Sequence, residues 1–162
     1  MPVFALLFIP NADNLAYRDV EGGKIKMLIP ADFKHQSKAE YKPKYQGDNP
    51  PDDYFFNTDM SEEVAITKMG GTATDVNSMR DMMTGVAKML ATKVYFNDTT
   101  RIKGVKMWML EMEGNDGHAA KYIKYEFFNA GDVPYMAAAE CQPQLKDKWK
   151  PVSDRIMSNI KW

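Results

Sequence analysis

The chain has little cysteine, little arginine and no long apolar run, and each shortage excludes a class of protein. A single cysteine, Cys141, permits no disulfide within the chain. Arginine supplies only 4 of the 21 basic residues and the formal net charge is −1, whereas nucleic-acid-binding domains are usually strongly basic. The apolar stretch at residues 3–9 is far too short to span a bilayer. We therefore expect no disulfide framework, no nucleic-acid partner and no membrane span.

The cellular compartment stays open from the sequence. Residues 3–9 are more typical of a buried strand than of a signal peptide, because no basic residue precedes them and no small-x-small cleavage site follows promptly. We expect a cytoplasmic protein if Met1 is the native start, and a periplasmic or exported one if a leader has been removed. A single cysteine is compatible with both compartments.

Motifs for catalysis and for cofactor or metal binding are also lacking. His35 and His118 have no second histidine or cysteine at metal-ligand spacing, which predicts no metal site. Cys141 lies beside Glu140, but no sequence pattern around it suggests a base that would activate the thiol, and no phosphate-binding glycine loop is present. We expect no cofactor and favour a protein that is not an enzyme. The alternative is a small enzyme whose site combines dispersed polar residues, namely Asp98, Arg101, Glu111 and His118.

Turn residues divide the chain into strands and two main helices. Apolar spacing predicts a helix over 78–91, with Ser78 as its N-cap and with close packing at Gly85. A second helix begins near Asp147 and is expected to bury Trp149, Val152 and Ile156. Strands are expected at 15–20, 24–29, 54–57, 63–69, 93–97, 101–112, 121–128 and 134–141. Because helices and strands do not alternate, we predict an α+β fold, an antiparallel sheet flanked by two helices in a single domain over 1–162.

Residues 34–53 have no clear hydrophobic period and are expected to form a long irregular loop. Lysines and tyrosines interleave there, and such a mixture can stack on and pair with a partner protein. We name this segment the Lys/Tyr loop. Its candidate partner-binding residues are Tyr41, Lys42, Lys44 and Tyr45.

The strand predicted over 101–112 carries apolar side chains on both faces, and methionine is abundant, at 13 of 162 residues. If both helices lie on one side of the sheet, the other side would expose an apolar surface for a partner protein, an apolar helix or a second copy of the chain. Its candidate residues are Met107, Trp108, Met109 and Met112. If the helices divide between the faces, these side chains belong to the core.

Three segments resemble the PsbP-like superfamily. The early hairpin ends in Lys24-Ile-Lys-Met-Leu-Ile-Pro30, followed by Phe33 where tryptophan is common in the family. The strand Glu63-Val-Ala-Ile-Thr-Lys68 leads into the amphipathic helix, and the segment from Trp149 to Lys161 resembles the last helix of these proteins.

The resemblance implies a fold and a kind of role. The superfamily includes the extrinsic PsbP subunit of photosystem II, a Ran-binding nuclear import factor, and bacterial relatives such as Eag-type chaperones, which shield apolar transmembrane segments. It implies an α/β/α sandwich and a non-catalytic accessory protein. We expect such a protein to engage a protein partner or an apolar segment through a sheet face or the Lys/Tyr loop.

Overall fold

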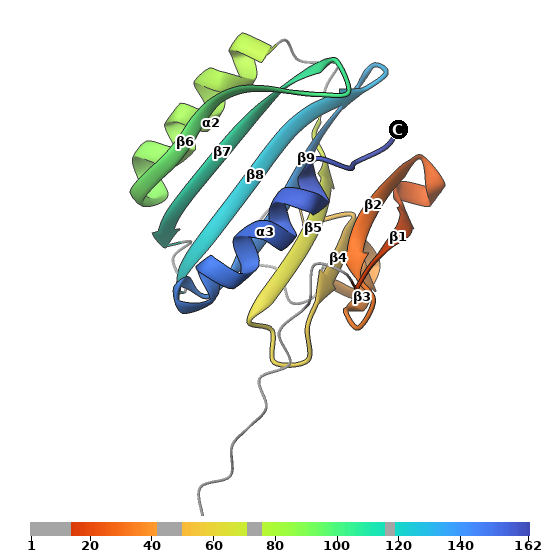
Figure 1. Ribbon diagram of the computed structural model, residues 1–162. Coiled ribbons are helices and arrows are strands. Elements are labelled where there is room, and N and C mark those ends of the chain that lie inside the picture. Colours follow the sequence, from red (N-terminus) through yellow and green to blue (C-terminus); the bar gives the residue numbers. More distant parts are fainter. Residues whose placement is uncertain (1–13, 42–49, 71–75, 116–118) are drawn as a thin grey trace, which may run out of the picture.

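An antiparallel sheet dominates the computed structural model, which describes residues 14–41, 50–70, 76–115 and 119–162 (Figure 1). Within these residues the sheet has seven strands in the order β3-β4-β5-β9-β8-β7-β6. A separate hairpin pairs two further strands, β1 and β2. The strands are β1 (Leu15–Val20), β2 (Ile25–Pro30), β3 (Lys34–Ser37), β4 (Asp53–Phe56), β5 (Glu62–Lys68), β6 (Ala91–Ile102), β7 (Val105–Asn115), β8 (Ala120–Ala130) and β9 (Val133–Cys141).

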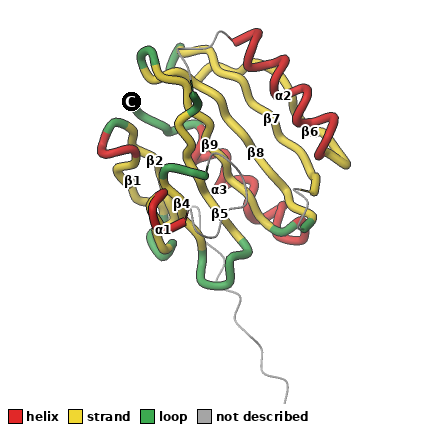
Figure 2. Tube along the Cα trace, turned by 180° about the vertical axis from the view of Figure 1, so that it is seen from behind, coloured by secondary structure: helices red, strands yellow, loops and turns green. Residues whose placement is uncertain are grey.

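The two long helices lie on opposite faces of the sheet, as Figures 1 and 2 show from front and back. Helix α2 (Val76–Leu90) contacts β6 and β7, whereas α3 (Lys146–Met157) contacts β2, β8 and β9. A short helix, α1 (Lys38–Tyr41), follows β3. This arrangement confirms the predicted α+β class with a sheet flanked by two main helices.

Each face of the sheet has its own hydrophobic core. On the α3 face, Trp149, Val152 and Ile156 pack with the apolar side of the β1–β2 hairpin, as the helical period predicted. On the α2 face, Met79 and Met83 are buried. Val86 and Leu90 are partly buried against the same cluster, whereas Met82, which also follows the apolar spacing of the helix, is 42% exposed.

The exposed apolar surface expected on β7 is wrong, because the helices divide between the two faces. Met107 is fully buried in the α3-side cluster. Trp108 and Met112 are 4% and 0% exposed in the α2-side cluster, and Met109 is half-buried. Side chains that alternate between faces thus enter two separate cores.

The turn predicted at residues 97–100, between the strands expected at 93–97 and 101–112, is wrong. These residues continue β6 without interruption, and Asn97 accepts a hydrogen bond from the indole nitrogen of Trp108 at 2.9 Å. The chain reverses instead at Lys103 and Gly104, whose φ angles are 51° and 86°. A two-residue turn with positive φ at both positions matches the right-handed twist of the strands it joins. Helix α2 likewise begins before Ser78, so Ser78 is not its N-cap.

The Lys/Tyr loop is more regular than the sequence indicated. Residues 34–41 form β3 and α1, and the side chain of Lys38 pairs with Asp52 at 3.0 Å. His35 Nε2 lies 2.7 Å from Asp53 Oδ1, which further ties β3 to β4. The predicted strand at 3–9 and the candidates Lys42, Lys44 and Tyr45 lie outside the described residues. No described helix combines the length and apolar character needed to cross a bilayer.

Candidate functional site

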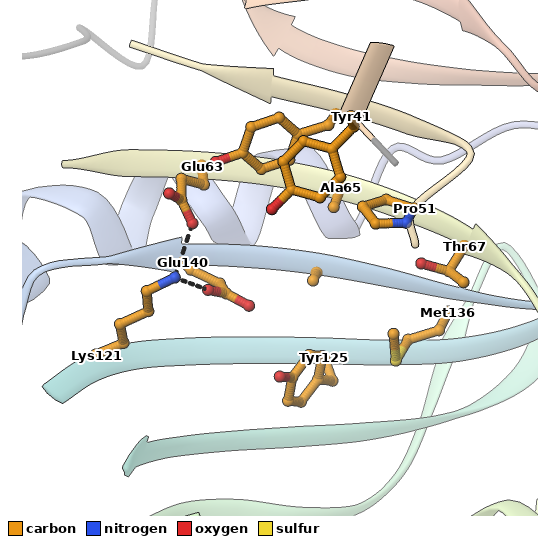
Figure 3. A pocket seen from close by; sticks show the side chains of 11 residues that line it. Tyr41, Pro51, Glu63, Ala65, Thr67, Lys121, Tyr125, Met136 and Glu140 are labelled. Carbon is orange, nitrogen blue, oxygen red and sulfur yellow. Dashed lines mark hydrogen bonds and ion pairs between the residues drawn. The ribbon is translucent and has the colours of Figure 1, made fainter. Parts of the chain in front are cut away.

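A groove lies on the α2 face of the sheet, beside the strands that α2 does not cover. Helix α2 packs on β6 and β7, and no other described helix lies over the middle of β8, β9 and β5 on that face (Figure 2). A cavity of about 200 Å³ opens there. We call it the sheet groove; its lining is Tyr41, Pro51, Tyr54, Glu63, Ala65, Thr67, Lys121, Tyr125, Met136, Ala138 and Glu140 (Figure 3).

Aromatic rings form the wall of the groove nearest α1. The ring of Tyr41, from α1, stacks on that of Tyr54, from β4, with 4.4 Å between centroids. Tyr54 in turn stacks on Phe56 at 5.3 Å. Burial, with Glu63 nearby, raises the pKa of Tyr54, so its hydroxyl stays protonated near neutral pH. The wall is a rigid surface that combines apolar ring faces with hydroxyl groups.

Small side chains form the floor of the groove. Ala65 on β5 lies directly opposite both Tyr54 on β4 and Ala138 on β9. Ala138 in turn pairs with Tyr125 on β8. Two alanines between larger neighbours leave a hollow, because a methyl group cannot fill the space that surrounding tyrosines enclose.

An ion cluster closes one end of the groove. Lys121 on β8 reaches Glu140 Oε2 at 2.8 Å and Glu63 Oε2 at 2.9 Å, as the dashed lines in Figure 3 show. Burial by itself would lower the pKa of Lys121, but the two carboxylates raise it above its ordinary value. Lys121 therefore stays an ammonium ion near neutral pH and holds two like charges on adjacent strands.

The groove contains one of the residues predicted from the Lys/Tyr loop, Tyr41. The sequence analysis did not identify Tyr54, Tyr125 or Met136, which also line the groove, as candidate binding residues. One sequence signal was available, the run of three alanines at 137–139, because alanine is less common in strands than β-branched and aromatic residues.

The dispersed polar residues of the enzyme alternative do not converge in the part of the chain that is described. Asp98 is exposed on β6, and Arg101 donates a hydrogen bond to the carbonyl oxygen of Gly104. Glu111 is instead held by Lys150 and by the hydroxyl of Tyr122. His118 lies outside the described residues.

The remaining chemical candidates are structural. Burial raises the pKa of the Cys141 thiol to about 12, which opposes formation of a reactive thiolate. Among residues 14–41, 50–70, 76–115 and 119–162, no three histidine, cysteine or acidic side chains are grouped so that they could hold a metal ion.

Comparison with known proteins gives a fold rather than a family. No protein-family model and no curated protein sequence matches the chain. The structure is similar to that of cyanobacterial PsbP (CyanoP) from Synechocystis sp. PCC 6803, with a TM-score of 0.60, 15% identity and 99% of both chains covered. The chain has a PsbP-like fold.

Two other proteins with similar structures extend this comparison. LpqN, involved in cell envelope biogenesis of Mycobacterium tuberculosis, matches with a TM-score of 0.57, 12% identity, and 85% of this chain and 82% of its own covered. A Pseudomonas aeruginosa protein of unknown function, PA94, described as a putative regulator, matches with a TM-score of 0.53, 10% identity, and 90% and 95% covered. The PsbP-like fold is therefore shared at identities too low to transfer a function.

Proposed function

We propose that this protein is a non-catalytic accessory protein that binds an apolar segment of a protein partner in the sheet groove. The observation that carries the proposal is the uneven cover of the sheet. Helix α3 and the β1–β2 hairpin pack over the centre of one face, whereas α2 leaves the groove uncovered on the other among the described residues. A concave surface lined by aromatic and small apolar side chains is typical of a binding site.

The chemistry of the lining supports binding rather than catalysis. Its tyrosines and Met136 offer apolar contact area, and methionine adapts its shape to varied apolar partners. Lys121 and Tyr54 both have raised pKa values, so neither can act as a base near neutral pH. A cavity of about 200 Å³ suits one or two apolar side chains of a partner segment rather than an entire helix.

The ion cluster favours a partner segment that combines apolar and polar residues. Lys121, Glu63 and Glu140 stand at one end of the groove and retain some exposure, between 15% and 23% for each side chain. Charged groups at the rim of an interface contribute mainly to orientation and to the choice of partner. We expect the bound segment to be apolar in its centre and polar at the end that meets these three residues.

Methyl NMR on the isolated chain tests the proposal. The probe is a helical peptide rich in leucine and alanine with lysines at both ends. We expect its addition to shift the methyl signals of Met136, Ala65 and Ala138, with the signals of the buried Met107 and Met112 unchanged. If no signal in the groove shifts, the proposal is wrong.

A matched pair of variants locates the binding site. Ala65→Glu places a charge on the groove floor and is expected to weaken peptide binding by about tenfold or more, which corresponds to about 1.4 kcal/mol. Ala16→Glu makes the same change at an exposed position on β1 and should leave binding unchanged. Equal binding by both variants would place the peptide elsewhere. A second copy of the chain, one of the alternatives left open by the sequence, would shift the same groove signals as protein concentration rises without peptide if it bound there.

A further inference from the structure

Another cavity, of about 230 Å³, lies at the end of the sheet where β6 turns into β7. The turn between β8 and β9 and the C-terminal end of the chain lie at this same end (Figures 1 and 2). We call this cavity the tip hollow; its lining is Ile102, Lys103, Val105, Ile160, Lys161 and Trp162. It shares no lining residue with the sheet groove, so the two are separate surfaces.

The two segments that form the tip hollow are basic. They span residues 99–110 and 155–162, and neither contains an aspartate or a glutamate. Together they carry five exposed cationic side chains: Arg101, Lys103, Lys106, Arg155 and Lys161. The neighbouring turn between β8 and β9 adds one exposed carboxylate, Asp132, and Asp154 is held by Lys124. This end of the molecule is therefore positive, although the net charge of the chain is −1.

Apolar side chains reach solvent among these cations. Trp162 is 41% exposed, and Val105, directly after the β6–β7 turn, is 39% exposed. The ring of Trp162 stacks on that of the buried Phe128, with 4.9 Å between centroids, so its position at the surface is fixed. The ammonium of Lys161 lies 3.7 Å from the ring centroid of Tyr17, which is also exposed. Exposed aromatic and aliphatic side chains surrounded by lysine and arginine are typical of a surface that meets a membrane.

The surface of an anionic bilayer matches both the charge and the apolar groups. Acidic phospholipid headgroups form a plane of negative charge that attracts lysine and arginine. Indole rings are favoured at the headgroup level, and aliphatic side chains just beneath it. The apolar groups of this end stand at a turn and at the end of the chain rather than inside a long groove, so they suit a broad flat partner.

We propose that the end of the molecule around the tip hollow docks on the surface of a bilayer that contains anionic phospholipids. Lys103 and Lys161 contact the headgroups, and Trp162 and Val105 enter the interfacial layer. Such docking needs no membrane-spanning helix. It is also independent of partner binding in the sheet groove, because the two surfaces share no residue.

Sedimentation with lipid vesicles tests this proposal. The probe is a vesicle of phosphatidylcholine and phosphatidylserine in equal amounts, and the control is a vesicle of phosphatidylcholine alone. We expect the chain to bind the mixed vesicles far more tightly than the control vesicles, and this binding to weaken as salt is added. No binding to the mixed vesicles, or equal binding to both kinds, would overturn the proposal.

Tryptophan fluorescence shows which part of the molecule binds. Trp108 and Trp149 are buried, so Trp162 is the tryptophan whose surroundings change on docking. We expect the mixed vesicles to shift the emission to shorter wavelength, and Trp162→Phe to lose this shift while still binding. A shift that persists in Trp162→Phe would overturn the proposed orientation.

A matched pair of double variants separates this end from general surface charge. Lys103→Gln with Lys161→Gln should weaken binding to the mixed vesicles about tenfold or more, since each cation near an anionic surface contributes about fivefold. Lys88→Gln with Lys148→Gln makes the same change in net charge at two exposed positions at the other end of the sheet. This control should bind much more tightly than the first double variant. Equal losses in both would mean that net charge alone drives binding, and would overturn the proposal.

An acidic peptide distinguishes a bilayer from an acidic protein. Decaglutamate offers negative charge without an apolar layer, so we expect it to leave the Trp162 emission unshifted. A shift as large as that caused by the mixed vesicles would favour an acidic protein partner and overturn the bilayer assignment. Ala65→Glu, which alters the sheet groove, should still bind the mixed vesicles, so failure of this proposal is distinguishable from failure of the proposed function.

Discussion

Phe33 and Trp149 stack with their ring planes 8° apart and their centroids separated by 6.0 Å. Phe33 follows the β1–β2 hairpin and Trp149 belongs to α3, so this stack joins the beginning and the end of the described chain. Both rings are buried in the core of the α3 face. The stack is one of the contacts that hold the hairpin against the body of the sheet.

Removal of Trp149 should therefore destabilise the whole fold. We expect Trp149→Ala to lower the free energy of unfolding by about 3–5 kcal/mol, measured by urea denaturation. Trp149→Phe should cost less, since it keeps an aromatic ring and removes an indole N–H that has no partner among the described residues. The control is Trp162→Ala, because Trp162 is 41% exposed and should contribute much less.

Two glycines should respond in opposite ways to the same substitution. A Cβ on Gly114 would lie 2.4 Å from the carbonyl oxygen of Leu90, so Gly114→Ala should destabilise the protein by about 1–3 kcal/mol. Gly85 lies inside α2, and apart from the backbone of its own helix no described atom lies within 4 Å of such a Cβ, so the close packing expected there is wrong. Gly85→Ala should stabilise the protein by up to about 1 kcal/mol. Thermal unfolding of both variants measures the difference in sign.

The ion cluster of the sheet groove predicts a pH-dependent cost for loss of Lys121. In Lys121→Met, Glu63 and Glu140 would face each other across adjacent strands without the ammonium between them. We expect a loss of about 1–3 kcal/mol at pH 7 that shrinks below pH 4, where the carboxylates are protonated. Lys26→Met is the matched control, because its pair with Asp19 is exposed and should contribute little. A cost at pH 3 equal to that at pH 7 would exclude this electrostatic origin.

Buried Glu126 predicts that stability falls as pH rises. The folded chain holds the proton up to a pKa of about 8, whereas an unfolded chain releases it near 4.5. Between these values the folded state binds more protons, so each pH unit lowers stability by at most about 1.4 kcal/mol from this group. Burial also raises the pKa of Glu62, to about 7, and gives a weaker trend of the same sign. Urea denaturation at pH 5.5, 6.5 and 7.5 should therefore show a shallower slope for Glu126→Gln than for the unaltered chain.

The sequence by itself determined most of the local structure. The hairpin at 15–30, the strands from 105 onward and the helix around Trp149 follow from turn residues and hydrophobic periods that act over a few positions. The α+β class follows from their order. The misread turn at 97–100 shows the limit of such reasoning, since polar side chains that usually mark a turn can also serve a strand when a partner such as Trp108 lies across from them.

Only the tertiary structure decided which surfaces stay open. The period of two along β7 required cover for both faces, but the sequence could not say that α2 and α3 divide between them and bury Met107, Trp108 and Met112. It also could not bring Tyr41, Tyr54, Tyr125 and Met136 together, because they come from separate elements whose pairing order is not sequential. Glu126 shows the same limit. A glutamate between Tyr125 and Phe127 on an alternating strand is usually solvated, and only the packing of α3 over β8 makes it a buried carboxyl group.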